Sequence, residues 1–173
     1  PIDVKMGPDG AIYVADWYNP IIQHGEVDFR DPRRDHVHGR IWRITAKDRP
    51  LVKQNKIVGA SMEELLEMLK AEEDWVRLWA KRELATHDKE EVAKALQDWI
   101  ATLADDAQRE QLLLEALWAH QTIDVVNEEL LRTLLVDEDH RIRAAAVRAA
   151  SMWRSRIEQP NMVFAAAVAH EHP

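Results

Sequence analysis

Side chains that can bind a metal gather in one stretch of the sequence, between positions 24 and 38. His24, Asp28, His36 and His38 carry the imidazole nitrogens and carboxylate oxygens that zinc and harder cations accept as ligands. On an extended chain, His36 and His38 would project to one side, because residues two apart share a face. We therefore name these four residues as metal-ligand candidates.

The same stretch alternates basic with acidic side chains, and neighbours of opposite charge usually pair with one another. In this alternative interpretation, the stretch is an ion-paired lid anchored by Trp17, Tyr18 and Phe29. A further alternative is that Arg33 and Arg34 hold an anionic cofactor or substrate through bidentate hydrogen bonds. The expected ion pairs would join Arg30, Arg33 and Arg34 to Asp28, Asp31 and Asp35.

Three short β-prone segments must position this stretch. Apolar residues alternate with polar ones over residues 2–6, and Gly7-Pro8-Asp9-Gly10 then supplies a turn before a second β-prone run at residues 11–15. A third strand is predicted at residues 41–45, after the charged stretch. Three strands cannot bury their own apolar faces, so we expect further strands to pack against them.

Composition divides the chain near residue 60. All five glycines lie at or before Gly59, which separates a turn-rich β segment from a helical one. Residues 1–50 hold eight basic and eight acidic residues out of totals of 23 and 31, so the net charge of -8 belongs to the helical part. We expect a β segment at residues 1–50, a linker at 51–60 and helices at 61–173.

Short amphipathic helices are predicted after residue 60. Ser61-Met62-Glu63-Glu64 reads as a capping box, and two similar acidic starts follow at residues 88–91 and 105–108. Apolar residues at helical spacing follow each start, and tryptophans at such positions usually pack between helices. These tryptophans are Trp75, Trp79, Trp99, Trp118 and Trp153.

The helical part repeats with a period near 33 residues. Residues 74–80 recur at 140–146, each with an apolar residue before an arginine and small residues after it. This pattern resembles the second helix of a HEAT repeat, whose arginine reaches back to acidic loop groups. The match falls on Arg77 and Arg143 as structural residues, whereas Glu110 departs from the pattern in the middle repeat.

Composition excludes several classes of function. The chain has no cysteine, so it carries no disulfide, thiolate metal site or covalently attached c-type haem. An acidic surface repels phosphate backbones, which argues against nucleic-acid binding. The longest uncharged run, residues 159–169, is too short to cross a bilayer.

A family resemblance supplies the functional expectation. The segment Gly7-Pro8-Asp9-Gly10-Ala11-Ile12-Tyr13-Val14-Ala15-Asp16-Trp17-Tyr18-Asn19-Pro20, with the strand at residues 38–45, resembles the last β-propeller blade of glucose/sorbosone-dehydrogenase-like proteins. The order of blade, charged loop, closing strand and HEAT repeats resembles the large membrane-bound dehydrogenases of planctomycetes. The implied fold is mixed and mainly α: a terminal propeller blade of three antiparallel strands, then a HEAT-like α-solenoid, with the chain as a fragment that is truncated at its C-terminus.

The resemblance implies an extracytoplasmic enzyme, periplasmic or membrane-associated, that oxidises a sugar or similar alcohol. By this resemblance, haem c, a quinone cofactor or Ca²⁺ would bind elsewhere in the larger protein, and no cofactor is expected in this chain. The residues of this chain would close the propeller and form the helical scaffold. The alternative is a non-catalytic scaffold that binds carbohydrate or a protein partner on the helical repeats. No catalytic residue is assigned in either case.

Overall fold

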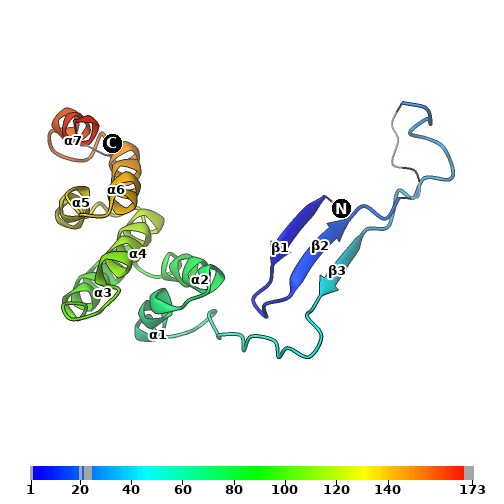
Figure 1. The fold of residues 1–173 in the computed structure, drawn as a ribbon, viewed down its shortest axis with the longest axis horizontal. Helices are drawn as coiled ribbons and strands as arrows, with labels where there is room; N and C mark the ends of the chain where they lie inside the picture. Colours follow the sequence, from blue (N-terminus) through cyan, green and yellow to red (C-terminus); the bar gives the residue numbers. More distant parts are fainter. Residues whose placement is uncertain (1, 20, 22–24, 170–173) are drawn as a thin grey trace. The chain divides into compact units, whose positions relative to one another are not determined.

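The computed structural model describes residues 2–19, 21 and 25–169. The chain forms two compact units, residues 1–55 and residues 56–173 (Figure 1). The first unit contains a small β-sheet and long loops, and the second is helical. The sequence-based expectation of a mainly helical chain with three N-terminal antiparallel strands is confirmed.

The first unit is a three-stranded antiparallel sheet in which the strands lie in chain order (Figure 1). Its strands are β1 (Asp3–Met6), β2 (Ile12–Asp16) and β3 (Arg40–Ile44). Each strand differs by about one residue from the predicted range. The register places Val14 opposite both Val4 and Trp42, so these three side chains share one face of the sheet.

The face that carries Val14 is apolar and open to solvent. Val4 is 57% exposed, Met6 65% and Ile44 53%. Opposite pairing places Met6, Ile12 and Ile44 in a second row on that same face. A sheet of this size buries too little apolar surface to be stable by itself.

Buried Asp9 locks the turn between β1 and β2 to the rest of the sheet. Its Oδ1 accepts a hydrogen bond from the backbone of Ala11 (3.1 Å), and its Oδ2 accepts from Tyr13 Oη (3.0 Å) and Arg43 Nε (2.9 Å). Gly10 follows with φ +76°, a conformation that favours glycine. Burial raises the pKa of Asp9, but the hydrogen bonds from Arg43, Ala11 and Tyr13 outweigh it and lower that pKa overall.

Seven α-helices and one 3₁₀ turn form the described part of the second unit. They are α1 (Met62–Glu67), η1 (Met68–Lys70), α2 (Asp74–Leu84), α3 (Lys89–Ala101), α4 (Arg109–Thr122), α5 (Glu128–Leu135), α6 (His140–Met152) and α7 (Pro160–Val168). Helices α2 and α6 begin 66 residues apart, at matching positions of the sequence repeat.

Two of the three predicted helix starts follow their capping residues. Ser61 and Glu64 form the predicted capping box at α1, and Asp88 accepts hydrogen bonds from two backbone N–H groups at the start of α3. The predicted start at residues 105–108 is wrong in detail, because α4 begins at Arg109. There the Asp106 carboxylate accepts from the backbone of Gln108 (2.8 Å) and stabilises the turn that precedes the helix.

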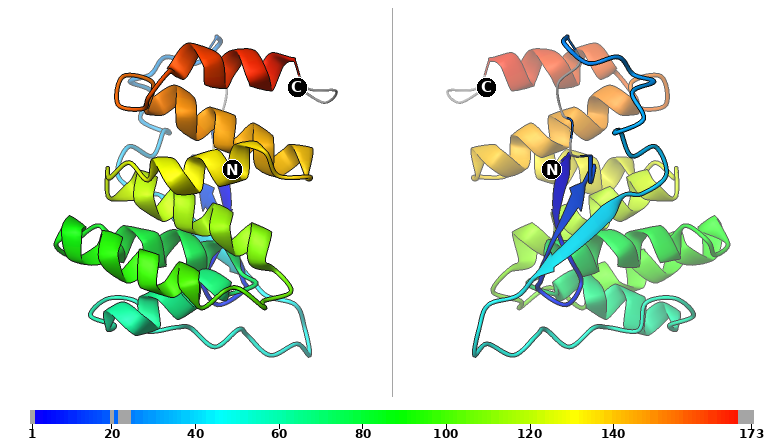
Figure 2. Two further views of the ribbon diagram at one scale, coloured as in Figure 1. Left: turned by 90° about the vertical axis from the view of Figure 1, so that its left-hand side faces the viewer. Right: turned by 90° about the vertical axis from the view of Figure 1, so that its right-hand side faces the viewer.

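Successive helices of the second unit stack in chain order (Figure 2). α4 contacts both α2 and α6, and α3 and α5 also pack against α4. The arrangement therefore places every second helix in one row, with α4 at its centre.

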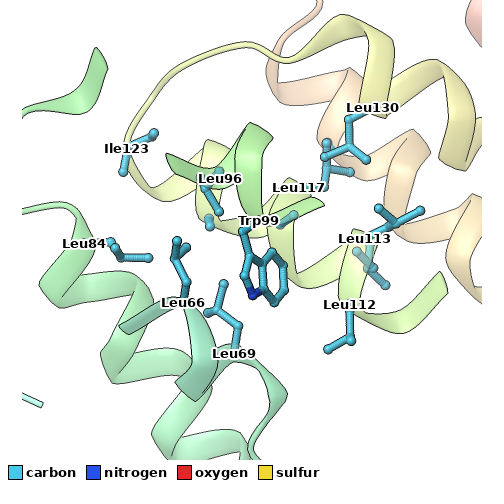
Figure 3. Close-up of a cluster of buried hydrophobic side chains, with 14 of the residues drawn as sticks. Leu66, Leu69, Leu84, Leu96, Trp99, Leu112, Leu113, Leu117, Ile123 and Leu130 are labelled. Atoms are coloured by element: carbon cyan, nitrogen blue, oxygen red, sulfur yellow. The ribbon is translucent and has the colours of Figure 1, made fainter. Parts of the chain in front are cut away.

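One continuous apolar core runs through this helical unit. Figure 3 shows Trp99 of α3 pointing toward Leu66, Leu69 and Leu112. Trp99 and Trp153 are buried, as expected for packing tryptophans, whereas Trp79 is 40% exposed. The core also includes Ile57 and Ala60, which lie in the segment predicted as a linker.

Candidate functional site

The charged loop between β2 and β3 is organised by one buried arginine, Arg34. Its Nε donates to Asp28 O (2.9 Å), its Nη1 to Ile21 O (3.1 Å) and its Nη2 to Val27 O (2.8 Å). The guanidinium also lies 5.5 Å from the ring centroid of Phe29. A planar group with five donors can satisfy several carbonyls at once, so Arg34 holds distant parts of the loop together.

Of the expected ion pairs in this loop, the structure shows Arg33 with Asp31. Arg33 Nε donates to Asp31 Oδ1 (2.9 Å) and Nη2 donates to Oδ2 (2.8 Å). These bonds lower the pKa of Asp31 to about 2. Arg33 is thus already engaged in the bidentate geometry that an anionic ligand would need.

The four metal-ligand candidates do not form a visible cluster. His24 lies outside the described residues. Asp28 Oδ1 accepts from the backbone of Arg30 (2.7 Å), and His38 Nδ1 lies 2.9 Å from Asp35 Oδ2. His36 is exposed. Within the described ranges, no three His, Asp or Glu side chains are close enough together to hold a metal ion, and the four-residue site stays a prediction.

Asp35 fixes the end of the loop before β3. Its Oδ1 accepts from the backbone N–H groups of Val37 and His38, both at 3.0 Å. These backbone bonds, with the His38 ring, lower the pKa of Asp35. The carboxylate therefore orients His38.

Arg40, the first residue of β3, contacts two aromatic rings. Its Cζ lies 3.9 Å from the ring centroid of Tyr18 and 4.7 Å from that of Trp42. Trp42 Nε1 donates to Asp16 Oδ2 (3.1 Å), which holds the indole in place. Arg40 and Trp42 are two residues apart on one strand face, which was a usable signal for this cluster, but our prediction did not include Arg40.

In the helical unit, Arg77 and Arg143 make equivalent backbone contacts. Arg77 Nη1 donates to Ala71 O (2.6 Å) and Glu72 O (2.8 Å). Arg143 Nη1 donates to the carbonyls 66 positions later, those of residues 137 and 138, at 2.7 and 2.9 Å. Each arginine ties the loop before its helix to the helix itself.

Buried Glu115 joins two helices of the same unit. Its Oε1 accepts from Arg77 Nε (2.9 Å), and its Oε2 forms an ion pair with Lys81. Lys81 also lies 5.3 Å from the ring centroid of Trp118. The sequence analysis missed this cluster, although an acidic residue within the apolar run of residues 112–117 was a usable signal.

A buried histidine, His120, contacts the residue that caps the next helix. Asn127 Nδ2 lies 3.1 Å from His120 Nε2, and Asn127 Oδ1 accepts from the backbone of Leu130 (3.0 Å) at the start of α5. Burial lowers the pKa of His120 to about 4. The neutral ring therefore accepts the Asn127 amide hydrogen, and its role is structural.

A family model described as a domain of unknown function (DUF7133) matches residues 1–48. No curated protein and no solved structure matches the chain. In the described part of the chain, none of the helices has both the length and the apolar character that a membrane span requires.

Proposed function

We propose that residues 1–50 form a blade of a β-propeller and residues 61–173 a HEAT-like scaffold, in an extracytoplasmic sugar or alcohol dehydrogenase. The exposed apolar face of the sheet carries this proposal. In a propeller, each blade packs its faces against neighbouring blades, which would cover Val4, Met6 and Ile44. The substrate class and the extracytoplasmic location follow from the family resemblance alone.

The arginine contacts support the scaffold part of the proposal. HEAT-type repeats reuse one arginine to stabilise the turn inside each helix pair, and Arg77 and Arg143 bind matching carbonyls one double repeat apart. The row formed by α2, α4 and α6 supports the same proposal.

We assign no cofactor-binding residue in this chain. A c-type haem needs a pair of cysteines, and the sequence has none. The role proposed for these residues is therefore to close the propeller and to present the helical surface.

The enzymatic proposal is tested on protein expressed from its complete reading frame. Reduction of an artificial electron-accepting dye would be followed with glucose, other aldoses and primary alcohols as substrates. We expect saturable dye reduction with at least one of them. If every sugar and alcohol leaves the dye oxidised, the dehydrogenase proposal is refuted.

The blade proposal has a separate test in the same protein. Val4→Asp places a charge on the apolar face, whereas Lys5→Asp changes the opposite face of β1 and serves as the control. If a neighbouring blade covers Val4, Val4→Asp should lower the unfolding midpoint clearly more than Lys5→Asp. Equal midpoints would contradict blade packing.

A non-catalytic binding scaffold is the second candidate, favoured by exposed apolar side chains on α2. Leu78 is 48% exposed, and Trp79 is 40% exposed with Arg82 lying 4.8 Å from its ring centroid. Exposed tryptophans of this kind can stack on sugar rings. Neutral disaccharides should then change tryptophan fluorescence in a saturable way, and Trp79→Ala should abolish the change while Trp17→Ala preserves it. An unchanged signal in the original chain would exclude sugar binding at this surface.

A further inference from the structure

Among the described residues, the contacts of the Arg40 guanidinium are made by aromatic rings. Tyr18 and Trp42 contact it through their rings, at 3.9 and 4.7 Å from Cζ. Within the described residues, no oxygen accepts a hydrogen bond from its side chain and no carboxylate pairs with it. Asp16 lies directly opposite in the β2–β3 register, yet its carboxylate accepts from Trp42. The N–H donors along the edge of Arg40 are therefore available to a ligand.

The other two arginines at the same place have their donors occupied. Arg33 pairs with Asp31 through two hydrogen bonds, and Arg34 binds loop carbonyls. Arg40 thus takes the anion-binding role that sequence analysis considered for Arg33 and Arg34.

Tyr18 is placed against Arg40 at a conformational cost. Its φ is +56°, a left-handed conformation that bulky residues rarely adopt and that costs of order 1 kcal/mol. The Tyr18 ring also meets His38 edge-on, with centroids 6.3 Å apart, and Asp35 fixes His38. Strain of this kind collects at ligand sites, where the surrounding structure holds a side chain ready for use.

These side chains line a surface hollow of about 770 Å³, which we call the Arg40 hollow. Its size suits a small organic molecule. Of its three arginines, Arg33 is neutralised by Asp31 and Arg34 binds loop carbonyls, so Arg40 supplies the guanidinium edge that faces the hollow. The other lining residues that matter here are Asp16, Tyr18, Asp35 and His38.

We propose that the Arg40 hollow binds the carboxylate of a small organic acid, with Arg40 donating to both carboxylate oxygens. The planar edge of a guanidinium matches a carboxylate in bidentate geometry. Asp16 and Asp35 border the hollow, so a carboxylate with one negative charge meets less repulsion there than a phosphate dianion with two. This inference does not require the proposed dehydrogenase activity; it requires that the end of this sheet face next to the loop, where Arg40 and Trp42 lie, stays open beside a neighbouring blade.

The test is an NMR titration of the ¹⁵N-labelled chain, following the Trp42 indole N–H and the Arg40 Nε–H. Sodium acetate and sodium benzoate are the probes at neutral pH and constant ionic strength, with chloride as the reference salt. We expect both signals to shift to saturation with either carboxylate and not with chloride. Shifts that stay linear, or that chloride reproduces, would overturn the proposal.

Three variants assign the binding to Arg40. Arg40→Gln should raise the dissociation constant about tenfold, the size expected when charge-assisted hydrogen bonds are lost. Arg40→Lys keeps the charge without the planar fork and should weaken binding severalfold, which preserves the test if Arg40→Gln unfolds the sheet. Arg30→Gln, the matched control, should leave the constant within about twofold, because Arg30 is an exposed arginine of the same loop that does not line the hollow.

Two further outcomes would contradict the proposal. One is an Arg40→Gln variant that keeps a native-like spectrum and binds acetate as tightly as the original chain, which would show that the carboxylate binds at another site. The other is inorganic phosphate binding more tightly than acetate in the original chain, which would refute the preference for a single charge.

Discussion

Replacing Glu115 by Gln tests whether the buried ion cluster holds the helical unit together. Glu115 and Lys81 are 2% and 8% exposed, so the variant leaves the Lys81 ammonium buried without a counter-charge. Breaking one partner of a buried pair costs about 3–5 kcal/mol. Arg77 keeps the carbonyls of Ala71 and Glu72 and is more exposed, so we expect the lower end, about 3 kcal/mol.

The assay is urea unfolding followed by the helical circular-dichroism signal. Glu110→Gln is the matched control, because Glu110 is an exposed residue on the same helix, and it should change the free energy of unfolding by less than about 0.5 kcal/mol. Adding Lys81→Met to Glu115→Gln should restore much of the loss, since an apolar replacement removes the uncompensated charge. A loss below about 1 kcal/mol for Glu115→Gln, with an unchanged urea slope, would refute the reasoning.

Three other predictions concern separate parts of the chain. Since burial depresses the folded-state pKa of His120 from 6.5 to about 4, stability should be full above about pH 6.5 and fall by about 3 kcal/mol as the pH drops toward 4. Urea midpoints across that range measure this loss, which His120→Gln should remove; an equal pH slope in both proteins would contradict it. Arg34→Met should speed amide hydrogen exchange in residues 25–34 while leaving the helices unchanged, and unchanged loop protection would show that Arg34 does not organise the loop. Ser61→Ala should cost about 1 kcal/mol of helical-unit stability in urea unfolding, through loss of the hydrogen bond to Glu64 N, and a cost near zero would show that the cap contributes nothing.

Local patterns predicted the elements well where the stabilising partners lie close in sequence. The capping box at Ser61 uses a residue three positions away, and the β1–β2 turn closes through Asp9 and Ala11. The start of α4 was misplaced because two aspartates in a row offer two equivalent caps, and Asp106 stabilises a turn instead of the helix.

The candidate site was harder to predict because its contacts are long-range. Arg34 binds the carbonyls of residues 21, 27 and 28. Every residue has a backbone carbonyl, so the amino-acid sequence does not indicate which carbonyls an arginine will bind. The Arg33–Asp31 pair, two residues apart, followed from charge order. Arg40 reaches Tyr18 across the whole loop, so its role emerged only with the fold.

The arginine–carbonyl bonds and the Glu115 ion cluster of the helical unit have different consequences for how the number of helix pairs can change. Arg77 and Arg143 bind carbonyls five or six residues earlier, so each contact is complete inside one helix pair. Whole pairs could therefore be duplicated or deleted without disturbing these ties. Glu115 instead reaches back 34 and 38 residues, to Lys81 and Arg77. Glu115 thereby ties the α3–α4 pair to the α1–α2 pair, so a deletion that removed α3 and α4 would leave Lys81 without this counter-charge.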